Sequence, residues 1–327
     1  MGKKIFVVGV QDEKVKVEKF LKKFGISYII AAQLIRKGNV KVNSKRQKSS
    51  CMLQLGDIVE LFGVTLNSIE KSIILTKKHE EIGQQLIQNI LYRDENILIL
   101  NKPAGIAVQG GNKVKISIDD LAEYLKFDLP NKPKLVHRLD RDTSGVLVMA
   151  RNDLTAKVLS SMFKASGTIK KSYLALCNGY PARLEGTISI PLAKVKLDKE
   201  IMCYSQNKKD EAITNYKVLQ HNEKFSLIQL QIVTGRTHQV RAHCATSGIP
   251  IVGDGKYNHE YFERIKSIMC HDEKKKFILN LKPINSYNYK KLCLHSALIE
   301  FTLFDKKISV NAPIPRDFQI LIDEIFT

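Results

Sequence analysis

The sequence lacks paired cysteines and long apolar runs, which excludes several classes of protein. Its six cysteines stand singly, none in a C-x-x-C pair, and no histidine lies at zinc-finger spacing from two of them. The Ile5–Val10 run is too short for the core of a signal peptide. No apolar stretch approaches the roughly 20 residues of a membrane helix. We therefore expect a soluble, cytoplasmic protein with reduced thiols and without structural zinc.

Acidic residues are also scarce. The 327 residues include 52 Lys and Arg but only 33 Asp and Glu, a net charge of +19. This excess of positive charge favours a polyanionic partner, and nucleic acid is the first candidate. A lysine-rich surface on an ordinary protein would account for part of the excess positive charge. The length fits one domain of ordinary size together with a small one.

Residues 15–64 are expected to form the small domain. Val17, Phe20, Leu21 and Phe24 recur at helical spacing, and Gly25 is a plausible stop. A second helix is predicted from an N-cap at Ser27 to a left-handed cap at Gly38, followed by short strands at 40–42 and 55–61. Residues 1–14 are expected as an N-terminal tail.

Positive charge is concentrated on the two short helices and the following turn of this small domain. Such clustering in so short a segment favours contact with phosphates over a merely solvated surface. The segment resembles the S4-type RNA-binding domain, in which two helices and a small sheet present a basic face to structured RNA. The candidate RNA-binding residues are Lys22, Lys23, Arg36, Lys37, Lys41, Lys45, Arg46 and Lys48.

Residues 65–88 lack a clear period and are expected to be a linker. In residues 89–327, strand-like runs follow one another without a regular helix between them, which predicts an α+β domain with a mixed, mostly antiparallel sheet. One helix is predicted from an N-cap at Asp153 to a stop at Gly167, and another over Phe318–Ile325. The expected strands are Ile97–Leu100, Val146–Ala150, Ser172–Cys177, Ile213–Leu219, Phe225–Val233 and Leu294–Phe304.

Three polar segments border these strands: Asn101–Gly105, His137–Gly145 and Thr234–His243. Polar loops anchored by buried strands commonly carry active sites, because the strands hold the reactive groups still. An aspartate between arginines in the central segment should stay ionised, and a further basic partner could come from Arg236 or Arg241. The residues alone do not choose Asp140 over Asp142, and a purely structural Arg–Asp network is an equal alternative.

Other chemistries fit these segments poorly. Asp140 and Asp142 are too close in sequence to face each other across a sugar as a glycosidase pair. His238 and His243 do not have the spacing of a helical zinc site. Ser144 is not in a G-x-S-x-G nucleophile elbow, and its segment is better suited to a turn. Gly105 to Gly111 has neither the dinucleotide nor the Walker spacing.

The order of the motifs resembles that of the RluA-type pseudouridine synthases. His137–Gly145 is similar to the signature of that family, and the Asn-Lys-Pro segment, Lys171–Ala175 and Thr234–Gln239 match its other motifs in order. The likeness runs from about Ile90 to Pro313. With the S4-like segment in front, it reproduces the domain order of the members that act on large-subunit ribosomal RNA, and the loop residues look most like those of the C type.

The resemblance implies that a uridine's N-glycosidic bond breaks, the uracil turns, and its C5 rejoins the ribose C1′. It makes Asp140 the catalytic aspartate, Tyr173 the active-site tyrosine and Arg236 the basic partner of the aspartate. Arg138 is a candidate for filling the space of the flipped base or gripping the backbone. No metal or organic cofactor is implied, because the product is an isomer of the substrate.

Two alternatives remain open from the sequence. The chain could be a transfer-RNA synthase of the same family, or a noncatalytic RNA-binding factor in ribosome assembly. Asp140, Tyr173 and Arg236 favour the enzyme, and the S4-like segment favours 23S ribosomal RNA as the partner. A monomer is the default expectation.

Overall fold

The computed structural model describes residues 3–24, 26, 28–62, 66–110, 114, 116–196, 200–205, 207–258, 261 and 289–327. The chain divides into two compact units, Met1–Gln85 and Leu86–Thr327. Gly25 and Ser27, the expected helix stop and N-cap, lie outside the described residues.

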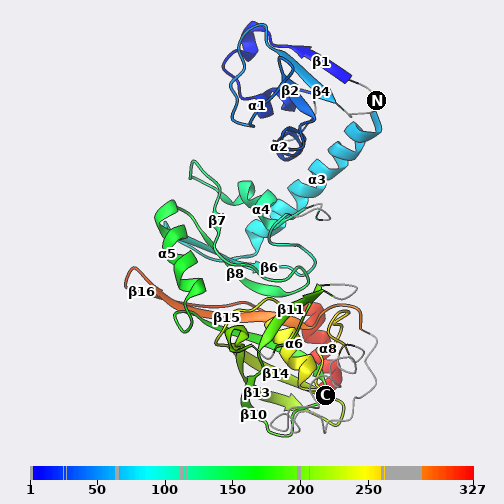
Figure 1. Cartoon of the computed structure of the whole chain (residues 1–327), viewed down its shortest axis with the longest axis vertical. Coiled ribbons are helices and arrows are strands. Elements are labelled where there is room, and N and C mark those ends of the chain that lie inside the picture. Colours follow the sequence, from blue (N-terminus) through cyan, green and yellow to red (C-terminus); the bar gives the residue numbers. More distant parts are fainter. Residues whose placement is uncertain are drawn as a thin grey trace. The chain divides into compact units, whose positions relative to one another are not determined.

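Unit 1 combines two short helices with a small antiparallel sheet. Helices α1 (Val17–Lys22) and α2 (Tyr28–Arg36) accompany strands β1 (Lys3–Val7), β2 (Val40–Val42), β3 (Lys45–Arg46) and β4 (Ile58–Phe62), with the order β1-β4-β2-β3 (Figure 1). Phe20 and Leu21 of α1 are buried against Ala31 and Ile35 of α2 and Val59 of β4. Gly38 has φ +77°, the left-handed conformation expected after α2.

The structure corrects two boundaries of unit 1. The expected tail is ordered: β1 pairs with all five residues of β4, and a 3-10 helix follows at Val10–Asp12. The expected linker forms helix α3 (Leu66–Gln88). Its many Lys, Glu and Gln residues have high helix propensity without an apolar stripe, so the sequence shows no period.

Unit 2 is built on a ten-stranded sheet with the order β10-β13-β14-β9-β15-β8-β6-β5, to which β16 adds beside β15 and β7 beside β8. The β15–β8 pair is parallel, and the other described pairs of this sheet are antiparallel. The mixed, mostly antiparallel sheet is therefore confirmed. The strands are β5 (Ile90–Arg93), β6 (Ile97–Lys102), β7 (Lys134–Leu135), β8 (Ser144–Ala150), β9 (Lys170–Asn178), β10 (Glu185–Ser189), β13 (Ile213–His221), β14 (Phe225–Ile232), β15 (Leu294–Leu303) and β16 (Lys306–Asn311), and a separate hairpin joins β11 (Leu192–Lys196) to β12 (Glu200–Tyr204).

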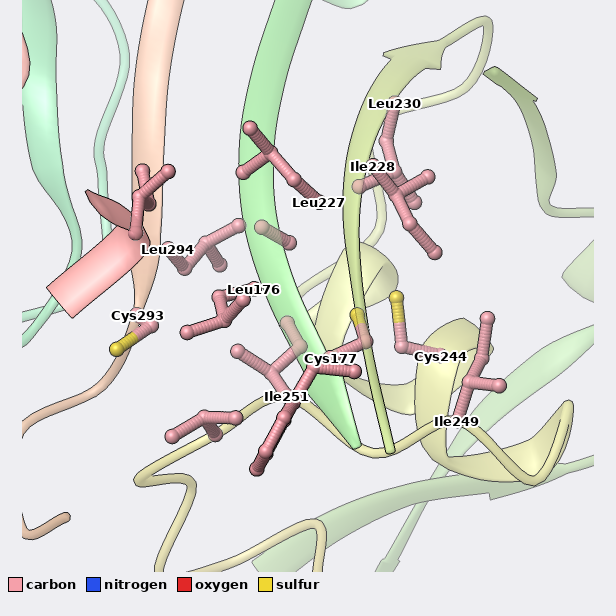
Figure 2. Packing of buried hydrophobic residues seen from close by; sticks show 14 of the residues in the cluster. Leu176, Cys177, Leu227, Ile228, Leu230, Cys244, Ile249, Ile251, Cys293 and Leu294 are labelled. Atoms are coloured by element: carbon pink, nitrogen blue, oxygen red, sulfur yellow. The ribbon is translucent and has the colours of Figure 1, made fainter. Parts of the chain in front are cut away.

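Helices cover both faces of the central strands. Figure 2 shows the neighbours Leu176 and Cys177 of β9 pointing to opposite sides, with Cys177 directed at Cys244 of helix α6 (Gln239–Thr246). On the other face, Leu227 of β14 lines a hollow together with Ile322 of helix α8 (Arg316–Phe326). Strand alternation therefore places Tyr173, four residues before Cys177, on the α6 face.

Helix α5 (Asp153–Lys164) packs Leu159 against Ile97, Val148 and Phe301 at the other end of the sheet (Figure 1). Its N-cap is Asn152, whose side chain accepts from the Thr155 amide, and not Asp153 as expected. Two adjacent residues that both favour capping explain the error of one position. In the described ranges, unit 2 also contains α4 (Ile118–Leu121) and the 3-10 turns Ala122–Leu125 and Lys208–Asp210.

Of the helices in the described part of the chain, none combines the length and the apolar composition needed to cross a bilayer. The cysteines within the described ranges, Cys51, Cys177, Cys203, Cys244 and Cys293, are free thiols. Over the same ranges no cluster of three or more His, Cys, Asp or Glu side chains could hold a metal ion.

Candidate active site

The central polar segment forms a loop between β7 and β8, and a buried lysine supports it. Lys102, at the end of β6, is fully buried, and its ammonium donates to the carbonyl oxygens of Pro103, Ile106 and Arg141 at 2.8, 3.0 and 3.0 Å. The three N–H groups of this ammonium meet three acceptors and so fix the segment after β6, with Pro103 and Ile106, against the central loop, with Arg141. Burial lowers the pKa of Lys102 to about 7, while Asp142 and Asp140 oppose this shift.

The loop is tied to the sheet at its two ends. At the start, His137 accepts a hydrogen bond from the Val148 amide through Nε2 at 2.8 Å and stacks on Phe163. Burial lowers the pKa of His137 to about 3, so this ring is a neutral acceptor. At the end, the Ser144 hydroxyl lies 2.9 Å from Nδ1 of the buried His295. The aspartate between these anchors therefore stands on a rigid support.

Asp140 is the partly buried carboxylate of this loop. Its side chain is 20% exposed, and its Oδ2 accepts from Nη1 of Arg241 at 3.1 Å. Nε2 of His238 lies 3.5 Å from its Oδ1. Asp142, by contrast, pairs with Arg141 on the surface, with 46% of its side chain exposed. The geometry thus distinguishes the two aspartates that the sequence left equal.

Arg241 joins Asp140 to a second, buried carboxylate. Its Nε and Nη2 donate to the two oxygens of Asp254 at 2.7 and 2.8 Å, and the Asp254 side chain has no exposed area. Burial opposes ionisation of Asp254, but Arg241 and the amides of Tyr257 and Lys256 hold its pKa below the ordinary value. Although burial opposes its charge, Asp254 and Asp140 raise the pKa of Arg241. This fork-like pairing fixes the guanidinium beneath Asp140.

The structure corrects the expectation that Arg236 is the basic partner of the aspartate. Arg236 lies in the loop before α6, where its Nη2 and Nε donate to the carbonyl oxygens of Lys209 and Glu211 at 2.6 and 3.1 Å. Arg241 lies in the first turn of α6 and reaches Asp140 instead. Both arginines belong to the same polar segment. Helix α6 begins between them, at Gln239, and the arginine inside the helix is the one that faces the carboxylate.

Tyr173 lies on the same face of β9 as α6, close enough for the charge of Asp140 to act on its hydroxyl. Burial raises the pKa of Tyr173 to about 12, and the nearby charge of Asp140 adds to this effect, while a hydrogen bond with Ser296 opposes it. The phenol is therefore protonated near neutral pH. Asp140, Arg241 and Tyr173 are brought together from β7–β8, α6 and β9, as a catalytic constellation requires.

Several residues of this site escaped the sequence analysis. Asp254 and Tyr257 received no role, because more than a hundred residues separate them from Asp140 and only the folded chain unites them. His238 was weighed only as a metal ligand. The polar Asp254-Gly-Lys-Tyr segment was the one sequence feature that could have pointed to Asp254 and Tyr257.

The candidate RNA-binding residues lie in unit 1, except for Arg138, which is exposed on the loop of Asp140. Arg36, Lys37, Lys45 and Arg46 are exposed. The guanidinium of Arg46 lies over Gly38, since a Cβ added there would be 2.6 Å from its Cζ. These charges therefore gather around the end of α2. Lys22 is also exposed, Lys23 pairs with Asp12, and Lys41 lies over the Phe62 ring.

A partly buried aspartate paired with a buried arginine, near a protonated tyrosine, is the candidate active site. Residues 96–246 match the family model of RNA pseudouridylate synthase. Ribosomal large subunit pseudouridine synthase C of Vibrio parahaemolyticus is 32% identical over 86% of this chain and 82% of its own length. The same-named protein of Rickettsia prowazekii is 33% identical over 93% of this chain and 95% of its own.

Two further relatives are more distant or only partly covered. RNA pseudouridine synthase 4, mitochondrial, of Arabidopsis thaliana is 44% identical over 51% of this chain, which spans only 40% of that protein. The solved structure of human RNA Pseudouridylate Synthase Domain Containing 4 has a TM-score of 0.59 at 24% identity, covering 76% of this chain and 97% of that one, which shows a shared fold. The chain belongs to the RNA pseudouridylate synthase family and is an RNA pseudouridine synthase, an isomerase.

Proposed function

We propose that this enzyme converts uridines of large-subunit (23S) ribosomal RNA to pseudouridine, with Asp140 as the catalytic carboxylate. The observation that carries the assignment of Asp140 is its contact with Arg241 in a partly buried site that also contains Tyr173. The names of the Vibrio and Rickettsia relatives support the choice of RNA. Action in the cytoplasm belongs to the same proposal, and the monomeric state stays a prediction.

Isomerisation breaks the N1–C1′ bond and forms a C5–C1′ bond, and overall one proton leaves C5 while N1 gains one. Asp140 is suited to the first step, because an ionised carboxylate can attack the sugar or stabilise the fragment that forms when the bond breaks. Arg241 pairs with that carboxylate and orients it. Because no atoms are gained or lost, these steps need no cofactor.

Tyr173 supports the later steps in this proposal. Its ring offers an apolar face against the uracil, and its protonated hydroxyl can donate a hydrogen bond while the base turns. Removal of the C5 proton by the phenol would require that it first lose its own proton, which burial disfavours. The target nucleotide must leave its stack to reach this site, and the exposed Arg138 is positioned on the loop to contact the RNA.

Unit 1 acts in this proposal as an S4-like RNA-binding unit. The end of α2 and strand β3 present Arg36, Lys37, Lys45 and Arg46 to solvent. Contacts of this kind neutralise phosphates and position the RNA without reading its sequence.

The proposal is tested by carbodiimide mapping of pseudouridines in ribosomal and transfer RNA from cells that lack the protein. Wild-type, Asp140→Asn and Asp142→Asn copies are then restored, the last being the same substitution on the surface aspartate. We expect discrete large-subunit pseudouridines to vanish and to return with the wild type and Asp142→Asn, but not with Asp140→Asn.

Each other outcome has a definite meaning. Loss confined to transfer RNA would replace the ribosomal substrate with a transfer-RNA one. An unchanged map would favour the noncatalytic assembly factor. Full restoration by Asp140→Asn would refute the assignment of the catalytic residue.

A further inference from the structure

A chain of hydrogen bonds leads from the backbone of β12 to the active site through Tyr257 and His238. The Met202 amide donates to the Tyr257 hydroxyl at 2.9 Å, and this hydroxyl lies 2.8 Å from Nδ1 of His238. The Tyr257 side chain is fully buried, and the His238 side chain is 20% exposed. The steps proposed for Asp140, Arg241 and Tyr173 use none of these groups.

The donors and acceptors of this chain fix the position of one proton. An amide N–H can only donate, so the Tyr257 oxygen accepts from Met202. Within the described ranges, Nδ1 of His238 is the acceptor that lies within reach of the remaining Tyr257 proton. A buried hydroxyl that left this proton unpaired would lose a hydrogen bond. Nδ1 therefore accepts, and the neutral imidazole carries its hydrogen on Nε2.

The Nε2–H group faces the reacting carboxylate. Nε2 of His238 lies 3.5 Å from Oδ1 of Asp140, while Arg241 holds Oδ2. The two carboxylate oxygens are thus distinguished, one held by a charged donor and the other facing a more distant neutral one. Catalytic hydrogen bonds are often long in an unliganded site and shorten when the substrate binds.

The surroundings of His238 favour the neutral ring. Burial lowers its pKa, and the positive charges of Arg241 and Lys256 lower it further, while Asp140 and Asp254 oppose them. Protonation of Nδ1 would also displace the Tyr257 proton. His238 has φ +51°, in the left-handed region, where a residue other than Gly or Asn is strained by about 1 kcal/mol. The contact with Tyr257 and the position of His238 directly before α6 hold the imidazole in place despite this strain.

We propose that His238 is a positioning residue for Asp140: Tyr257 fixes its Nε2–H tautomer, and the neutral ring orients Oδ1 while Arg241 holds Oδ2. The inference rests on the proposed role of Asp140. It predicts that catalysis needs a neutral donor at this position and that removal of the Tyr257 hydroxyl frees the imidazole to take up a proton on Nδ1.

Two substitutions of His238 distinguish the contribution of Nδ1, which contacts Tyr257, from that of Nε2, which faces Asp140. In His238→Asn, the amide keeps an acceptor near Tyr257 and tolerates the left-handed backbone, but it is too short to reach Asp140. In His238→Gln, the longer amide can place an N–H close to the position of Nε2 and cannot titrate. His221→Gln is the matched control, because His221 is exposed and stacks on Tyr180.

The rate is measured in single turnovers on an unmodified large-subunit RNA transcript with the full chain. We expect His238→Asn to lower the rate constant about 10- to 100-fold with unchanged RNA affinity, and His238→Gln to recover most of the loss. Tyr257→Phe should move the acid limb of the pH–rate profile to higher pH, because the ring then protonates more readily. Equal rates for His238→Asn and the wild type, or an unmoved acid limb, would overturn the inference.

The tautomer is measured independently of activity by ¹⁵N NMR of the histidine rings, with the His238 signal identified by its absence in His238→Gln. We expect a protonated Nε2 and an unprotonated Nδ1 in the wild type. A protonated Nδ1 would refute the inference even if the enzyme is active. If Asp140→Asn proves fully active, the proposed catalytic role of Asp140 fails, and the NMR result still tests the tautomer.

Discussion

At the scale of single residues, the site depends on which arginine reaches Asp140. Arg241 contacts both Asp140 and the buried Asp254, whereas Arg236 donates to two backbone carbonyl oxygens. Asp254 is fully buried, so loss of Arg241 leaves a carboxylate without its main partner. Arg241 therefore joins the proposed catalytic carboxylate to a carboxylate of the interior of unit 2.

The pair Arg241→Gln and Arg236→Gln tests this division. We expect Arg241→Gln to lower the single-turnover rate constant by about 100-fold or more and the stability by about 3 kcal/mol, because it removes both carboxylate contacts. Arg236→Gln loses only bonds to neutral carbonyl oxygens and should lower the rate much less. Single-turnover kinetics, at a temperature where chemical denaturation shows both variants folded, measures the difference. A larger loss for Arg236→Gln would restore the assignment drawn from the family resemblance.

At the scale of secondary structure, the active site depends on the close parallel contact of β8 with β15. Gly145 pairs with Ser296 and has φ +108°, and a Cβ added to it would lie 2.1 Å from the Ser296 oxygen. Ser296 also pairs with Tyr173 on the next strand. The backbone contact at Gly145 thus joins the loop of Asp140 to the strand of Tyr173.

We expect Gly145→Ala to destabilise the protein by about 3 kcal/mol or more, because the left-handed backbone and the carbonyl contact both oppose a side chain. The control Gly255→Ala should change stability little, since open space surrounds that position. Thermal and chemical denaturation of the full chain compare the two. If both variants are equally stable, β8 and β15 can move apart to accommodate the methyl group without a loss of stability.

The elements also show what the sequence can predict. Six of the strands of unit 2 and the helix at Phe318–Ile325 were predicted because their residues are mostly apolar and bounded by turns. Helix α3 was missed because it has high propensity without an apolar stripe. Arg241 was considered as a partner but not chosen, and Asp254 was missed, because the contact depends on where α6 begins and on long-range packing.

At the scale of the whole molecule, the positive net charge and the S4-like unit in front of the catalytic unit lead to one hypothesis, that unit 1 binds RNA. The net charge of +19 and the exposed Arg36, Lys37, Lys45 and Arg46 of unit 1 predict an electrostatic contribution to RNA binding. The S4-like character of unit 1 stays a prediction. The structure adds that Lys3–Val7 belongs to its sheet, because β1 pairs with β4.

The double variant Lys45→Ala, Arg46→Ala tests whether unit 1 binds RNA through phosphates. Each lost phosphate contact should lower the slope of log affinity against log salt by about 0.7 to 0.9, so two contacts should lower it by about 1.5. Lys217→Ala, Lys224→Ala is the control, because it removes the same charge from exposed positions of unit 2. Filter binding of a large-subunit RNA transcript at several salt concentrations gives the slopes. If both double variants lose the same slope, the effect is one of net charge, and unit 1 makes no specific phosphate contacts through β3.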